Sequence, residues 1–216
     1  MNDTLVETTK NFVKEQLKYA EGGHDWFHTE RVFKTAKKIS EKEEVDPLVV
    51  QLAALLHDIA DPKFHNGDEE IGPKTAQEFL TSQDLDPIRT NHVANIIRHM
   101  SFKNSLDKDQ PKFNSLELQV VQDADRLDAI GAIGIARTFN YGGFKNRPMY
   151  DPRIEPNLNM TKEEYKKSNA PTINHFYEKL LLLKDQINTD TGRELAAERH
   201  QFMLDYLKQF YKEWNT

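Results

Sequence analysis

Histidine and aspartate residues are the side chains of this sequence whose types and spacing could do chemistry. The chain has eight histidines, and six of them precede residue 100. The central pair is His57-Asp58, which directly follows the apolar run 52–56. An ionised carboxylate at the end of a buried helix is costly unless it is paired with another charge or bound to a metal. The pair therefore predicts a metal-ligand site, and His28, on the apolar face of an earlier helix, is a further candidate ligand.

Further ligands must come from other helices. Adjacent residues of a helix point about 100° apart, so a neighbouring histidine and aspartate hold an ion only from one side. Asp123, Asp125 and Asp128 lie in an apolar helical segment downstream, and helical phase alone does not choose between Asp123 and Asp125. Two imidazoles and two carboxylates suit manganese, iron, cobalt, nickel or magnesium. Taken alone, a histidine on an apolar face is more often a hydrogen-bonded core residue; the combination favours the metal site.

Helical patterns dominate the elements that must position these residues. Asp46-Pro47 and Asp86-Pro87 each combine an N-cap residue with proline at the first helical position. Pro62 ends one pattern, whereas Gly131 and Gly134 allow a bend or close packing within another. The predicted helices cover about 5–20, 26–39, 47–59, 73–80, 87–99, 116–139, 172–187 and 191–214, and segments 101–114 and 141–159 are predicted to be irregular. No run alternates as a strand does, so we expect an all-α fold of about ten helices.

Composition limits the function classes. The 216 residues carry 29 basic and 35 acidic side chains, a net charge of −6 that disfavours binding to nucleic acid or to an anionic membrane surface. Cysteine is absent, which excludes disulfides, thiolate nucleophiles and cysteine-ligated metal centres. The segment 1–18 is charged throughout, and the longest apolar stretch, 129–136, is far shorter than a membrane span. We therefore expect a soluble, cytoplasmic protein.

The order and local context of the candidate ligands resemble a known family. His28, His57-Asp58 and Asp125 follow the H…HD…D signature of the HD-domain metal-dependent phosphohydrolases. The contexts that agree are His-Thr-Glu-Arg-Val at 28–32, Leu-Leu-His-Asp-Ile-Ala-Asp at 55–61 and Asp-Ala-Asp-Arg-Leu-Asp-Ala at 123–129. The segments 136–143 and 175–181 are also similar to a subgroup of small bacterial HD proteins, so the resemblance spans nearly the whole chain.

The resemblance implies a fold, a ligand set and a domain. We expect an HD-type helical bundle that forms a single domain over 1–216, with a metal-site core at about 20–130 and a C-terminal helical extension at about 140–216. One divalent cation is expected on His28, His57, Asp58 and Asp125, with manganese expected first and magnesium, cobalt, nickel and iron as alternatives. Asp125 is chosen because the family's aspartate follows alanine and precedes a segment ending in leucine. Asp123 would then orient a ligand or an arginine.

The resemblance also implies roles around the ion. Asp61 follows His57 by four residues, about one helical turn, and is the candidate general base that positions the attacking water; the alternative is a helix-end residue before proline. The candidate substrate-binding residues are cations, histidines and one tyrosine, namely Arg31, Lys63, His65, His99, Arg126, Arg137 and Tyr141. His92 and His99 can share a helix face, where they could contact phosphate, support a ligand or bind a second metal. We interpret the remaining histidines, His24, His175 and His200, as structural.

The expected function is hydrolysis of nucleoside triphosphates, deoxy forms included, to monophosphate and pyrophosphate. The alternatives are a phosphomonoesterase or phosphodiesterase acting on nucleotides, and a non-catalytic nucleotide-binding helical module. The expected partner is a small-molecule nucleotide, and a homodimer is left open.

Overall fold

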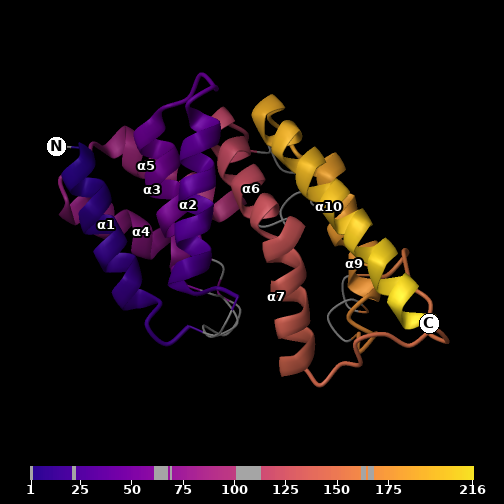
Figure 1. The fold of residues 1–216 in the computed structure, drawn as a ribbon. Helices are drawn as coiled ribbons and strands as arrows, with labels where there is room; N and C mark the ends of the chain where they lie inside the picture. The colour runs from indigo at the N-terminus through magenta and orange to yellow at the C-terminus, as the bar shows by residue number, and fades with distance from the viewer. Residues whose placement is uncertain are drawn as a thin grey trace. The chain divides into compact units, whose positions relative to one another are not determined.

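The computed structural model describes residues 2–20, 23–60, 68, 70–100, 113–161, 164 and 168–216. These residues form α-helices and one 3-10 helix, and the described part of the chain contains no strand. The fold is therefore all-α, as the sequence patterns predict (Figure 1). None of the helices in the described ranges is long and apolar enough to cross a membrane.

The chain divides into two units, Met1–Asp125 and Arg126–Thr216. The first contains α1 (Asn2–Gln16), α2 (Trp26–Ser40), α3 (Pro47–Leu56), α4 (Ile71–Ser82), α5 (Pro87–His99) and most of α6 (Leu116–Asp128). Helix α3 packs against α1, α2 and α5, and α4 packs against α5 (Figure 1). Eight of the ten residues of α3 are buried, so the apolar run that precedes His57 forms the centre of this unit.

Capping interactions fix where the site-bearing helices begin. Asp46 accepts hydrogen bonds from the backbone N–H groups of Leu48 and Val49, and Asp86 caps α5 in the same way through Arg89 N. Both helices have proline in the first turn, which confirms the two Asp-Pro start signals. Asp25 caps α2 by accepting from His28 N at 2.9 Å. The caps thus set the registers of the helices that carry the candidate ligands.

The helix predicted over 116–139 is wrong in one respect, because the structure has two helices there. Helix α6 ends at Asp128, and α7 (Gly131–Phe144) begins after Ile130. Gly131 has φ +77°, a left-handed conformation that glycine adopts without steric cost. The glycine therefore allows a sharp change of direction that periodicity cannot show, and α7 continues to Phe144, past the predicted start of the irregular segment at 141.

The second unit contains α7, α9 (Asn174–Glu178), the 3-10 helix η3 (Leu180–Gln186) and α10 (Asp190–Trp214). Helix α10 packs against α7 and η3. The rings of Phe139, Phe176 and Tyr206 lie 5.9–6.1 Å apart and form an aromatic core between these elements. The long helix predicted over 172–187 is wrong: Lys179, at φ −146°, separates a five-residue α-helix from the 3-10 helix.

Candidate metal centre

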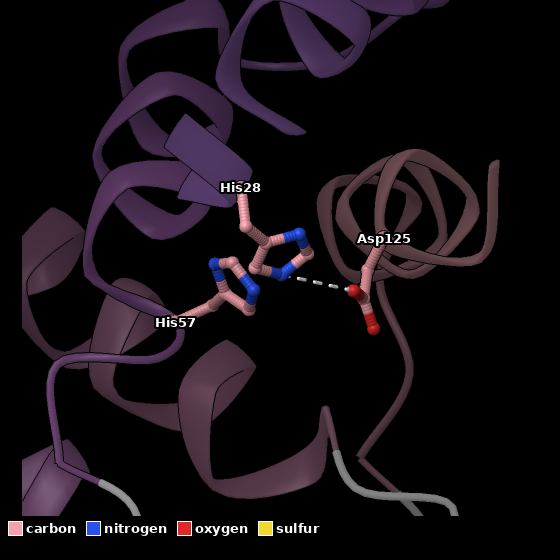
Figure 2. Close-up of side chains that lie close together, drawn as sticks. All are labelled: His28, His57 and Asp125. Atoms are coloured by element: carbon pink, nitrogen blue, oxygen red, sulfur yellow. Dashed lines mark ion pairs between the residues drawn. The ribbon is translucent and has the colours of Figure 1, made fainter. Parts of the chain in front are cut away.

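Three helices bring the predicted ligands together within the first unit. His28 lies in the first turn of α2, His57 is the C-cap of α3, and Asp125 lies on α6. One side-chain atom of each lies within 4.8 Å of the others, and Figure 2 shows the three side chains pointing toward one another. His28 Nε2 is 3.5 Å from Asp125 Oδ1. The arrangement matches the geometry in which ligands arrive from separate helices.

Asp58 borders the same group. Its Oδ2 lies 3.8 Å from His28 Nε2, so two carboxylates approach one ring nitrogen of a histidine that is only 2% exposed. Two carboxylates that approach the same buried group are more stable when positive charge lies between or beside them. A divalent cation is a strong source of such charge, and the mixed imidazole and carboxylate set suits it.

The orientation of His57 is that of a metal ligand. Its Nδ1 lies 2.9 Å from the carbonyl oxygen of Ala54, and because a carbonyl only accepts, Nδ1 carries the proton. The Nε2 atom then presents a lone pair, and it is buried without a hydrogen-bond partner in the described residues. An unsatisfied buried polar atom costs about 1–3 kcal/mol. A cation at Nε2 would remove that cost, so the residues fit the group that the sequence implies.

His24 also belongs to this site, which the sequence interpretation missed. Its Nδ1 lies 2.5 Å from Asp58 Oδ2. Burial acts to raise the pKa of Asp58, but the hydrogen bond from His24, together with the electrostatic attraction of the neighbouring histidines, outweighs burial and holds that pKa well below its usual range. The carboxylate is therefore ionised, as a metal ligand must be. The four-residue spacing between His24 and His28 is the feature of the sequence that could have indicated a place for His24 at this site.

The two candidates for the fourth ligand differ in exposure. Asp123 is fully buried, whereas the side chain of Asp125 is 45% exposed and faces His28. The prediction chose Asp125 on its sequence context, and the geometry places Asp125, not Asp123, in the group of potential ligand atoms.

The other residues that the sequence predicts around the proposed ion either lie outside the described part of the chain or have contacts of their own. Asp61, Lys63 and His65 lie outside the described residues. Arg31 lies partly buried on α2, one turn after His28. His99 Nδ1 donates to Asn95 O at 2.8 Å, and the His99 ring contacts Phe113.

The His92 side chain is engaged within the first unit. Its Nε2 lies 3.0 Å from Ser115 Oγ and 3.5 Å from Glu117 Oε2. A second metal centre on His92 therefore gains no support from the described residues.

The three predicted substrate residues of the second unit make contacts within that unit. Arg126 donates to Gln186 O at 2.8 Å, and Arg137 pairs with the buried Asp128 at 2.5 Å. Tyr141 is exposed, and the Arg147 guanidinium lies 5.6 Å from its ring centroid. The two arginines thus connect the C-terminal end of α6 to η3 and to α7, while Tyr141 presents a ring at the surface.

Comparison with known proteins identifies the family to which this chain belongs. The HD domain model matches residues 26–130. Protein YpgQ of Bacillus subtilis is 38% identical over 208 residues, 96% of this chain and 93% of YpgQ. A crystal structure of an HD-superfamily hydrolase from Bacillus thuringiensis matches over 100% of both chains, with a TM-score of 0.81 and 42% identity. The crystal structure of YpgQ in complex with ADP matches over 96% of this chain and 97% of that chain, with a TM-score of 0.74 and 34% identity.

These matches show that the chain belongs to the HD-domain family. The all-α fold and the H…HD…D order of its candidate ligands are consistent with that family.

Proposed function

We propose that this protein is a divalent-metal-dependent phosphohydrolase that converts nucleoside triphosphates to monophosphates and pyrophosphate. The observation that carries the proposal is the convergence of His28, His57 and Asp125, with the buried, unpartnered Nε2 of His57 aimed into the group. Similarity to an HD-superfamily hydrolase supports hydrolysis. The ADP complex of YpgQ supports a nucleotide as the substrate class.

The proposed ligands are His28, His57, Asp58 and Asp125. A divalent cation bound there, manganese in our proposal, would lower the pKa of a bound water and polarise a phosphoryl oxygen. The two carboxylates would supply negative charge, and the hydrogen bond from His57 Nδ1 to Ala54 O leaves Nε2 as the nitrogen that could bind the ion.

Asp61 is the proposed general base. Its carboxylate would accept a proton from the water that attacks the α-phosphorus, while the bond from that phosphorus to the bridging oxygen breaks and pyrophosphate leaves. We expect Asp61→Asn to keep metal binding and to lower turnover by about 10²–10⁴-fold, because the amide cannot accept the proton. If the variant loses metal in proportion to activity, Asp61 is a ligand or a structural residue instead.

The substrate class is tested by a screen of nucleoside mono-, di- and triphosphates with manganese, cobalt, nickel and magnesium, in which phosphate and pyrophosphate are resolved. We expect pyrophosphate and nucleoside monophosphate from triphosphates, and neither product from Asp58→Ala. Release of phosphate from monophosphates would instead indicate a phosphomonoesterase. No product with any metal, together with nucleotide binding, would indicate a non-catalytic module.

A further inference from the structure

His24 lies at the metal centre without belonging to the H…HD…D ligand pattern. It precedes the α2 N-cap residue Asp25, and its Nδ1 is 2.5 Å from Asp58 Oδ2. Its ring also lies edge-on to that of His28, with centroids 6.1 Å apart. His24 thus touches one candidate ligand and stands beside another.

We propose that His24 is a positioning residue of the metal centre, which holds the Asp58 carboxylate in place for the ion. The inference rests on the proposed metal-dependent function. A carboxylate only accepts hydrogen bonds, so the Nδ1–H of His24 donates to it. A hydrogen bond to an ionised group is shorter and stronger than one between neutral groups. It therefore restrains the Asp58 side chain, which lies just past the end of α3.

The local backbone makes this restraint rigid. Asp25 Oδ1 accepts from His28 N at 2.9 Å, so the helix start is fixed between His24 and His28. The same short turn carries a ligand on one side and the partner of a second ligand on the other. A shift of α2 relative to α3 would change the His24–Asp58 contact. His24 therefore couples the start of α2 to the end of α3.

His24 acts through Asp58 and not as a ligand itself. The nitrogen that contacts a candidate ligand is Nδ1, and its N–H donates a hydrogen bond to Asp58 Oδ2. A protonated ring nitrogen has no lone pair for a metal. Residues that hydrogen-bond to ligands typically change metal affinity or activity by about 10–100-fold when they are removed.

The test is a calorimetric titration of metal-free protein with Mn²⁺ alone. His24→Ala removes the donor, and His24→Asn retains an N–H donor close to the position of Nδ1. We expect His24→Ala to weaken Mn²⁺ binding by about 10–100-fold and His24→Asn to restore most of the affinity. His200→Asn, on α10 in the other unit, is the matched control and should bind as the wild type does. Unfolding in the presence of EDTA should be similar for the wild type and the two His24 variants, because the His24 side chain is 44% exposed.

Each outcome decides the question. Equal Mn²⁺ affinity of His24→Ala and wild type would overturn the positioning role. Equal losses in His24→Ala and His24→Asn would show that His24 is itself a ligand, and would also overturn it. If the wild type binds no Mn²⁺, the proposed metal centre fails as well, so the two failures are distinguishable. Should His24→Ala not fold, His24→Ser is the second truncation and is interpreted in the same way.

Discussion

Replacing Gly131 by alanine should destabilise the protein through the break between α6 and α7. Gly131 has φ +77°, and an alanine in the left-handed region costs about 1–2 kcal/mol. A Cβ at this position would lie 3.0 Å from Cγ and 3.1 Å from Cβ of Arg199. The Arg199 guanidinium donates to the carbonyl oxygen of Leu127, so moving this side chain adds about 1 kcal/mol. We therefore expect a loss of about 2–3 kcal/mol in the free energy of unfolding.

Gly143→Ala is the matched control for this change. Gly143 lies in α7, and a Cβ there would meet nothing within 4 Å. Alanine should stabilise this helical position by up to about 1 kcal/mol. Urea unfolding, monitored by circular dichroism, measures the free energy of unfolding of both variants. In a thermal scan, the loss of about 2–3 kcal/mol relative to the wild type should lower the melting temperature of Gly131→Ala by about 4–12 °C. If both variants unfold at the same urea concentration, the assigned role of the left-handed glycine is refuted.

Three further predictions concern the metal centre and the second unit. His57→Ala and Asp58→Ala should each abolish metal-dependent hydrolysis while retaining the circular dichroism spectrum, and a folded variant with near wild-type turnover would contradict the ligand assignment. Asp125→Asn should lower Mn²⁺ affinity sharply, because a neutral amide is a poor donor to a divalent ion, whereas Asp123→Asn should cost at most about 10–100-fold; the reverse order in calorimetry would place the ligand two residues earlier. Burial, together with the charges of neighbouring Lys179 and Arg147, lowers the pKa of His175 from 6.5 to about 4, so the unfolded chain binds a proton that the folded protein does not. Stability should therefore fall as pH drops from 6.5 toward 4, and His175→Gln should remove about 2–3 kcal/mol of the loss between pH 7 and pH 4.5 in urea unfolding.

Local signals explain which parts of the fold could be predicted. The Asp-Pro pairs at 46–47 and 86–87 mark helix starts because both residues act within one turn, and the structure confirms both starts. The apolar run of α3 likewise predicts burial because the length of the run leaves no polar face. The break at Gly131 depends on a left-handed backbone conformation, and the interruption at Lys179 on a residue whose φ of −146° is not helical. Neither changes the hydrophobic period: the sequence indicated Gly131 as a place where the helix could bend, but not that the helix ends there, and it gave no sign of the interruption at Lys179.

The candidate site shows the same division. The H…HD…D order singled out His28, His57 and Asp125 because metal ligation would restrict both residue type and spacing. The structure brings these three side chains together, and their role as ligands stays a prediction. His24 belongs to no such pattern, since its contact with Asp58 joins residues 34 positions apart. Arg126 was proposed to contact substrate because it adjoins Asp125, and Arg137 because its segment could shape the pocket. In the structure the guanidinium group of Arg126 donates to Gln186 O and that of Arg137 to Asp128. The position of an arginine in the sequence does not show which group its guanidinium contacts in the folded protein.

The most direct test of the account measures nucleoside monophosphate formation as Mn²⁺ is added stepwise to metal-free protein. We predict no turnover without metal, a linear rise in rate, and a plateau at about one ion per chain, with no rise for folded Asp58→Ala. Turnover that needs no metal, or an equal rise in the Asp58→Ala protein, would contradict the claim that His28, His57, Asp58 and Asp125 form the catalytic metal centre.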